Sequence, residues 1–167
     1  MDAPDSKGMT ALHYAAKKGH SRVLTMLCLA KANGNAKTNS AGNKTPAHLA
    51  CMEGHVAAVR ILHNHAKADL LMTTKAGKSC LHLAAGANNS NSAKTIAYLM
   101  ENTKFTVNEK DASGSAAIHY AAECGSLDNV RCLVEEYKAD LNLQDKCGQT
   151  PMHVAAFKAL SRKTPWT

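Results

Sequence analysis

The stretch Thr45-Pro46-Ala47-His48-Leu49-Ala50-Cys51 decides the fold, because four variants of it occur elsewhere in the chain. In every copy the histidine is followed by one bulky residue, then by alanine and a second small residue. Consecutive histidines of the pattern lie 35, 34, 37 and 34 residues apart. A pattern that recurs at a nearly fixed spacing predicts stacked copies of one supersecondary unit. The five histidines are His13, His48, His82, His119 and His153.

Each copy is preceded by a turn and continues into two amphipathic segments. The turn has the form Asp-x-x-Gly or a relative of it, as in Asp111-Ala-Ser-Gly114, and its glycine provides the positive φ that a chain reversal needs. Thr or Ser then serves as a helix N-cap in four units, with proline at the first helical position in two of them. In the fourth unit Ala116 and Ala117 replace Thr-Pro, and we expect the lost cap to cost about 1 kcal/mol.

The Thr45-Pro-Ala-His48-Leu-Ala phrase, with its period near 33 residues, resembles the ankyrin repeat from Asp5 to about Lys158. The resemblance implies an all-α solenoid of stacked helix-turn-helix units with β-turn fingers, forming a single domain over residues 1–167. It also implies that the five histidines form hydrogen bonds within and between the fingers, and that each unit exits through a short strand. The expected repeats are approximately 5–38, 39–73, 74–110, 111–144 and a partial 145–160, followed by a tail at 161–167.

Two irregularities interrupt the repeat pattern. The third unit carries three extra residues within Gly86–Ser92, and this polar stretch is expected to be a loop, either a tolerated surface extension or a partner contact. The fifth unit lacks an apolar second helix, and no helix pair precedes the first unit. Since solenoids need capping units at their ends, we expect the chain to be a segment of a longer protein.

Composition and charge limit the classes of partner and compartment. The net charge is +7, which would suit an acidic protein, an anionic lipid or a nucleic acid, but an aromatic content of 4% disfavours nucleic acid because bases stack on aromatic side chains. No apolar stretch is long enough to span a membrane, and the N-terminus lacks a signal-peptide pattern. The six cysteines are therefore expected to be reduced thiols in a cytoplasmic or nuclear protein, which we expect to be a monomer.

The sequence offers no recognisable catalytic or metal-binding constellation. It contains no Gly-rich phosphate loop, no Gly-x-Ser-x-Gly, no His-Glu-x-x-His and no Cys-x-x-Cys. His63 and His65 form a His-x-His pair, but residues two apart on a helix do not share a face. We therefore expect no enzymatic activity, no cofactor and no metal site.

The family resemblance places partner binding on the concave groove that the finger tips and the first helix of each unit form. Lysines in most fingers indicate either a solvated edge that aids solubility or a groove for an acidic segment of a partner. Apolar Met52 and Phe157 among these charges are typical of interface anchors. The candidate binding residues are Lys7, Met9, Lys17, Lys18, Met52, Glu53, Lys75, Lys78, Ser113, Glu123, Lys146, Phe157 and Lys158.

The sequence thus predicts a non-catalytic scaffold that binds another protein through its concave groove. Two alternatives stay open. One is a regulatory ankyrin segment of a larger membrane protein or enzyme whose activity lies elsewhere. The other is a basic surface that binds nucleic acid or anionic lipid.

Overall fold

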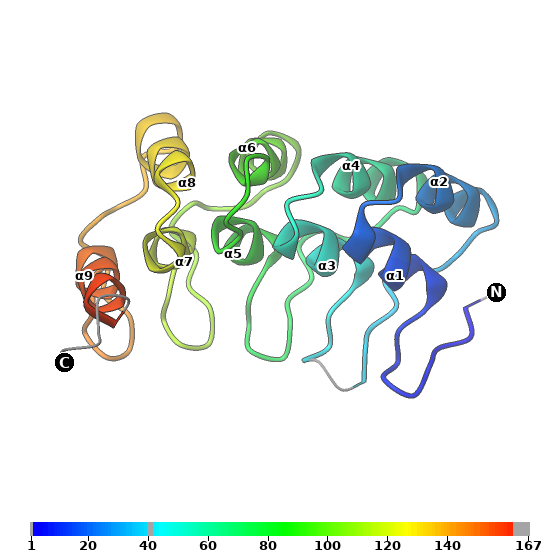
Figure 1. The fold of residues 1–167 in the computed structure, drawn as a ribbon, viewed down its shortest axis with the longest axis horizontal. Coiled ribbons are helices and arrows are strands. Elements are labelled where there is room, and N and C mark those ends of the chain that lie inside the picture. The colour runs from blue at the N-terminus through cyan, green and yellow to red at the C-terminus, as the bar shows by residue number, and fades with distance from the viewer. Residues whose placement is uncertain (1, 40–41, 162–167) are drawn as a thin grey trace, which may run out of the picture.

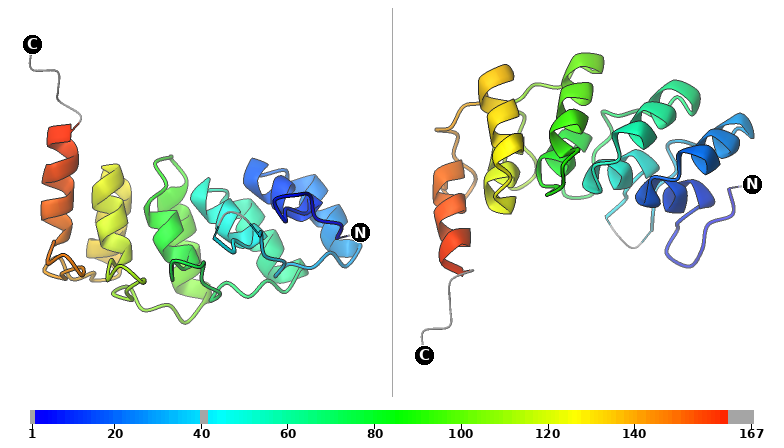
Figure 2. Two further views of the ribbon diagram at one scale, coloured as in Figure 1. Left: turned by 90° about the horizontal axis from the view of Figure 1, so that it is seen from below. Right: turned by 45° about the horizontal axis from the view of Figure 1, so that its top comes forward.

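A computed structural model describes residues 2–39 and 42–161 as a row of stacked helix pairs, with α1 and α9 at opposite ends of the row (Figure 1). The helices form two layers, and long loops project from the inner layer (Figures 1 and 2). The inner layer holds α1 (Ala11–Lys18), α3 (Pro46–Met52), α5 (Cys80–Ala85), α7 (Ala117–Cys124) and α9 (Pro151–Ser161). The outer layer holds α2 (Ser21–Leu29), α4 (Val56–His65), α6 (Ser92–Asn102) and α8 (Leu127–Arg131), which continues into the π-helical turn η1 (Cys132–Glu136).

This architecture confirms the predicted all-α solenoid. The expectation of a short exit strand in each unit is wrong, because the exit segments are turns, and only the isolated bridge between Lys110 and Ala116 pairs like a strand within the described residues. No helix in the described part of the chain is long and apolar enough to cross a bilayer. From the sequence, the second unit is also expected to carry two extra residues between Ala36 and Thr45. The tip of that finger includes residues 40 and 41, which lie outside the described ranges.

The repeated histidine joins each inner helix to its own finger and to the next one. Nδ1 of His48 accepts a hydrogen bond from the Thr45 backbone N–H at 2.9 Å. The Nε2 atom therefore carries the proton and donates to the Met72 carbonyl, 2.8 Å away near the third finger. His13, His82 and His119 repeat both contacts, with Nε2 bonded to Lys44, Glu109 and Leu143 carbonyls respectively. Four buried imidazoles thus tie successive units together.

His153 departs from the role that the family resemblance implies. Its Nδ1 accepts the Thr150 backbone N–H at 3.2 Å, so the bond within its own finger is made. The side chain is exposed, however, and within the described residues no acceptor contacts its Nε2. The expected bond between fingers is therefore missing at His153, because the described residues include no finger beyond the fifth to supply a carbonyl.

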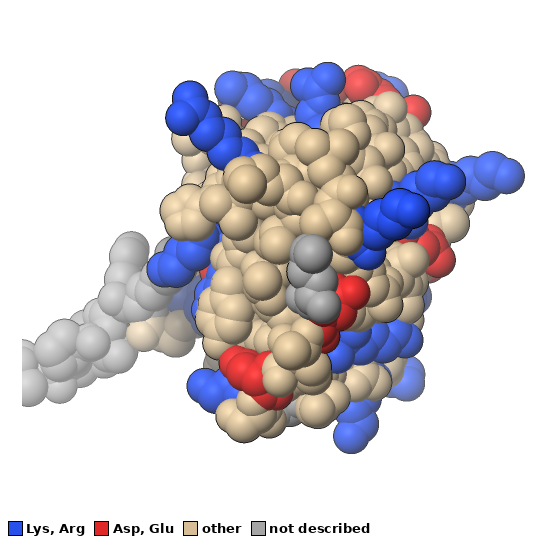
Figure 3. All heavy atoms as spheres, turned by 90° about the vertical axis from the view of Figure 1, so that its right-hand side faces the viewer, with Lys and Arg blue, Asp and Glu red and all other residues tan. Residues whose placement is uncertain are grey.

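Apolar residues at equivalent positions of successive units make one continuous core. The position just before the repeat histidine is buried at Leu12, Ala47, Leu81 and Ile118, but Met152 at the same position of α9 is 67% exposed. At the other end, Val23, Met26 and Leu29 of α2 are 46%, 70% and 74% exposed. Figure 3 views that end and shows a largely uncharged face, with basic side chains around its rim and a few acidic side chains in its lower part and along its edge. Both end units therefore expose large apolar side chains.

The inserted loop after α5 is held by Asn129 of the following unit. Asn129 is fully buried, and its Nδ2 donates to the carbonyls of Ala85 and Ala87 at 3.0 and 2.9 Å. Its Oδ1 accepts from the Ser92 hydroxyl at 2.7 Å. On the other side the loop touches Gly54 of the second unit, where φ is +65° and an added Cβ would overlap the Asn89 side chain. The loop is thus fixed by contacts to both neighbouring units.

Candidate protein-binding surface

The fingers form one edge whose spacing is set by backbone hydrogen bonds. We call residues 5–10, 38–45, 74–79, 111–116 and 145–150 fingers 1 to 5. The Lys75 N–H donates to the Gly42 carbonyl at 2.7 Å, the Ala112 N–H to Ala76 at 3.1 Å and the Lys146 N–H to Ser113 at 3.0 Å. Asn39 in finger 2 is joined to Lys7 in finger 1 in the same way, at 3.0 Å. Lysines on different fingers are therefore held in a fixed order along this edge.

A buried carboxylate organises finger 4 and fixes Tyr120 beside it. Oδ1 of Asp111 accepts from the backbone N–H groups of Ser113 and Ser115 at 2.8 and 3.1 Å, and Oδ2 accepts from the Tyr120 hydroxyl at 2.6 Å. Burial alone would raise the pKa of Asp111, but these hydrogen bonds outweigh it and the pKa is lowered. Burial, together with the bond to Asp111, raises the pKa of Tyr120 to about 12. The pair is thus an anion bonded to a neutral phenol.

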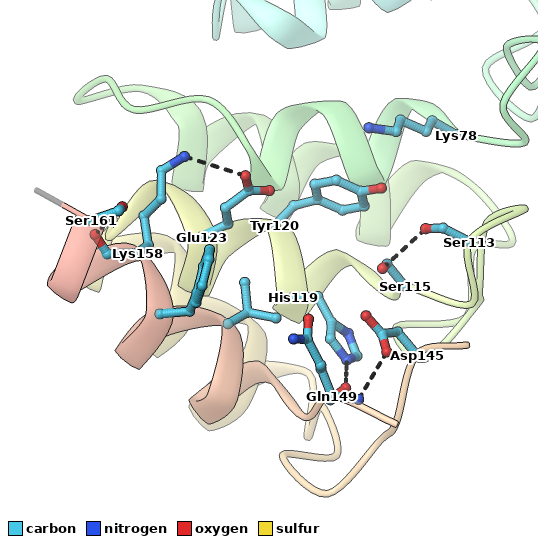
Figure 4. Close-up of a pocket in the computed structure, with 12 residues that line it drawn as sticks. Lys78, Ser113, Ser115, His119, Tyr120, Glu123, Asp145, Gln149, Lys158 and Ser161 are labelled. Atoms are coloured by element: carbon cyan, nitrogen blue, oxygen red, sulfur yellow. Dashed lines mark hydrogen bonds and ion pairs between the residues drawn. The ribbon is translucent and has the colours of Figure 1, made fainter. Parts of the chain in front are cut away.

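Three adjoining pockets run along the inner helices and meet at Tyr120. The α7–α9 pocket, about 410 Å³, lies between these two helices and fingers 4 and 5 (Figure 4). The Gly86 pocket and the α5 pocket, about 280 and 190 Å³, share Tyr120 and Gly86 with each other. Together the three pockets make a groove that runs from the end of α3 in the second unit to α9 in the fifth.

Charged side chains over this groove are partly paired. The Lys158 ammonium lies 3.6 Å from a Glu123 carboxylate oxygen, and Figure 4 shows this pair bridging α9 and α7. The Lys78 ammonium lies 4.2 Å from the centroid of the Tyr120 ring and reaches toward that ring from finger 3 (Figure 4). The ring therefore holds a lysine side chain over the groove.

The predicted binding residues divide into two groups. Lys78, Ser113, Glu123, Phe157 and Lys158 line the α7–α9 pocket, and Met52 joins Lys78 in the α5 pocket. Seven others line none of the three pockets and lie on the fingers or at the ends of α1 and α3: Lys7, Met9, Lys17, Lys18, Glu53, Lys75 and Lys146.

Sequence reasoning missed Tyr120, Leu83 and Gly86, which line the groove. A signal for Tyr120 was present, because the tyrosine follows the repeat histidine and stands nine residues after the finger aspartate. The same arrangement occurs in the first unit, where Tyr14 donates to Asp5 at 2.7 Å. Leu83 and Gly86 gave no such signal, because they line a pocket only when stacking brings residues of the neighbouring units next to them.

The described residues contain no group of three or more His, Cys, Asp or Glu side chains arranged to hold a metal ion. The Nδ1 atom of His63 lies 2.9 Å from the Tyr98 hydroxyl of the next outer helix, so this histidine joins two units. All six cysteines are unbridged, and only Cys147, in finger 5, is exposed. The candidate site is therefore a surface for contact, built from fingers and inner helices.

Comparison with known proteins agrees with this geometry. A family model described as "Ankyrin repeats (many copies)" matches residues 2–50 and 99–155, and one described as "Ankyrin repeats (3 copies)" matches residues 28–111.

Among curated relatives, the chain is 28% identical to Synphilin-1 of Mus musculus over 90% of this chain and 16% of that protein. It is 31% identical to the Probable 26S proteasome regulatory subunit p28 of Saccharomyces cerevisiae, over 89% of this chain and 64% of the relative. It is 27% identical to Palmitoyltransferase AKR1 of Lachancea kluyveri, over 94% of this chain and 21% of the relative. The chain thus spans less than two thirds of the length of each of these proteins. Since the family models together cover most of its repeats, the chain belongs to the ankyrin repeat family.

Proposed function

We propose that this chain is a non-catalytic module that holds a partner protein in its concave groove, and that the partner presents an acidic segment. Ankyrin repeats mediate contacts between proteins, and the family is typically non-catalytic. The observation that carries the proposal is that Lys17 on α1, Lys75 in finger 3 and Lys146 in finger 5 have no carboxylate partner within the described residues. The two side-chain ion pairs in the described ranges, Arg131–Glu135 and Lys158–Glu123, leave the exposed Lys17, Lys75 and Lys146 unpaired.

A pair of charge-matched variants tests the proposal. One variant, called the groove variant, carries Lys17→Glu, Lys75→Glu and Lys146→Glu, on the end of α1 and on the fingers and outside the lining of the three pockets. Its control carries Arg22→Glu, Lys94→Glu and Lys104→Glu, which are exposed residues on or next to the outer helices. Both change the net charge equally, and exposed substitutions usually alter stability by no more than about 0.5 kcal/mol each.

Wild type and both variants serve as baits for affinity capture from nuclease-treated lysate, with quantitative mass spectrometry. A groove partner is captured by wild type and by the outer control but lost by the groove variant, and its binding to wild type weakens as salt rises. Equal capture by the groove variant at low salt would refute the proposal. Nuclease treatment removes complexes that depend on nucleic acid.

The compartment and the oligomeric state are also proposals. We propose that the module works as a monomer in the cytoplasm or nucleus, because its six unbridged cysteines suit a reducing environment. Light scattering after size-exclusion chromatography should return a mass near 17.8 kDa. A mass that rises with concentration would contradict the monomer.

A second candidate function, a regulatory segment within a larger protein, is favoured by the exposed apolar ends. Met152, Met26 and Leu29 occupy faces that would pack against further repeats, and the chain spans 16% of Synphilin-1. Fusing capping repeats with polar outer faces to both ends should raise the melting temperature and reduce binding of a hydrophobic dye. An unchanged melting temperature would argue against this candidate.

A further inference from the structure

We infer that the groove selects a peptide segment in which one carboxylate stands between two apolar side chains, and that the carboxylate binds Lys78. This inference rests on the proposed function. It narrows the recognition of the acidic segment from the basic surface as a whole to Lys78 and the apolar side chains around it.

Lys78 differs from the other finger lysines in being held in place. Its ammonium lies 4.2 Å from the Tyr120 ring centroid and its side chain is half-buried, whereas Lys75 and Lys146 are exposed. A cation over an aromatic face is attracted by the electrons of the ring. Because Lys78 has already lost rotamer freedom, it loses less entropy when a partner carboxylate arrives. Lys78 is therefore preorganised for an anion.

The acidic side chains around the groove do not neutralise Lys78. Asp111 accepts the Tyr120 hydroxyl and finger N–H groups, and Asp145 accepts the N–H groups of Cys147 and Gln149 at 2.8 and 2.9 Å. Glu123 pairs with Lys158. Within the described residues no carboxylate forms an ion pair with Lys78. The charge of Lys78 is thus left for a ligand.

Apolar surface lies on both sides of Lys78. It lines the α5 pocket together with Met52 and Leu83, and it lines the α7–α9 pocket together with Val154 and Phe157. Phe157 is 71% exposed, so its ring is accessible to a partner as an aromatic anchor. A segment that spans both pockets would place an apolar side chain in each and its carboxylate between them, at Lys78.

Gly86 offers a way to block the groove without disturbing the fold. It lines both the α5 pocket and the Gly86 pocket, and its φ is not in the left-handed region. A Cβ at this position would meet its nearest neighbours, the His82 carbonyl oxygen and Tyr120 Cβ, at 3.6 Å, which is ordinary van der Waals contact. Gly86→Leu should therefore fold and fill the groove beside Tyr120.

The test uses a phage-displayed library of random linear peptides selected against wild type, Lys78→Glu and Lys146→Glu. Wild type should enrich peptides with Asp or Glu between two apolar residues. Lys78→Glu should enrich Lys or Arg at that place, while Lys146→Glu should keep the acidic preference. An enriched peptide, resynthesised, should bind Lys78→Gln about tenfold more weakly than wild type, because a charge-assisted contact is lost. Lys146→Gln should weaken the same peptide by no more than about twofold, since its lysine stays solvated.

The outcomes separate this inference from the proposed function. If peptides bind wild type and lose binding in Gly86→Leu, but show no acidic preference or keep it in Lys78→Glu, the inference fails and groove binding stands. The inference and the proposed function both fail if no peptide is enriched. Both also fail if enriched peptides bind Gly86→Leu, and the variant with Lys17→Glu, Lys75→Glu and Lys146→Glu, as tightly as they bind wild type. Circular dichroism and melting curves of each variant check that the fold is retained.

Discussion

The Tyr120 hydroxyl donates a 2.6 Å hydrogen bond to Oδ2 of Asp111, and this bond links the inner helix α7 to its own finger. The first unit repeats it between Tyr14 and Asp5, but there both residues are exposed. The same hydrogen bond thus occurs in a buried and in an exposed setting, and we expect it to contribute more to the stability of the fold where it is buried.

We predict that Tyr120→Phe lowers the free energy of unfolding by about 1–2 kcal/mol, because it removes a donor from a buried carboxylate. Tyr14→Phe is the matched control and should have a smaller effect, since water replaces the lost donor at exposed Asp5. Urea unfolding at neutral pH measures both. Equal losses in the two variants would contradict the role of burial.

Acid should destabilise the solenoid through its buried histidines. Burial lowers the pKa of His48 to about 4, against an ordinary value of 6.5, and lowers the pKa of His13 and His82 in the same direction. The unfolded chain takes up these protons below about pH 6.5, whereas the folded chain does not. Stability is therefore full above pH 6.5 and falls toward pH 4, with His48 alone contributing on the order of 3 kcal/mol.

Urea unfolding between pH 7 and pH 4 measures this loss. His48→Gln should be less stable than wild type at pH 7, because the link to Met72 is altered, but it should lose less stability on acidification. A pH dependence identical to that of wild type would show that His48 is not the group that titrates.

The fourth unit should gain stability from a restored cap. Ala116 has φ −92° and ψ 170°, nearly the angles of Thr45 at the same position, and both are buried. Ala116→Thr should therefore place a hydroxyl beside the first turn of α7 and raise stability by about 1 kcal/mol, seen as a higher melting temperature. Ala116→Val, of similar shape but without the hydroxyl, should not. A lower melting temperature for Ala116→Thr would show that packing excludes the added atoms.

Asn129 should control the order of the inserted loop. Asn129→Ala leaves the buried carbonyls of Ala85 and Ala87 without their donors, and we expect a loss of about 3 kcal/mol with faster hydrogen exchange in the loop. Asn88→Ala, in an exposed part of the same loop, is the control and should change neither the free energy of unfolding nor the rate of hydrogen exchange in the loop. Unchanged exchange in Asn129→Ala would mean that the loop is held by other contacts.

The cysteines should differ widely in their rate of reaction with a thiol reagent. Cys147 is exposed and should react first, Cys124 is half-buried, and the other four are buried. Denatured, unreduced protein should yield six thiols per chain. Cys147→Ser should abolish the fast phase and leave the slower ones. A denatured count near zero would indicate disulfides and a different compartment.

The repeated phrase was enough to predict the fold, because the histidine, the N-cap and the turn glycine each act within about one unit of chain. The buried series Leu12, Ala47, Leu81 and Ile118 follows from the same periodicity. The predicted exit strands failed because a short extended segment needs a pairing partner, and the stacked exits contact one another as turns.

The groove was predictable only in part. Family likeness led to Lys78 and Phe157, which both line the α7–α9 pocket, but which lysine is held over an aromatic ring depends on how neighbouring units stack. Nothing in the sequence around Asn129 indicates that its side chain reaches across to the preceding unit. Contacts between units depend on packing distances that a periodic sequence pattern does not encode.

The inserted loop has a consequence for how this chain could be cut or shuffled. The stability of a repeat protein is usually described as the sum of the stabilities of its single repeats and of the interfaces between adjacent repeats. Here Asn89 of the inserted loop lies against Gly54 of the second unit, while Asn129 of the fourth unit donates a hydrogen bond to the Ala87 carbonyl of the same loop. The second and fourth units are therefore coupled through the inserted loop of the third. Replacing any one of these three units with a consensus repeat should remove contacts that the other two make with the loop or through it.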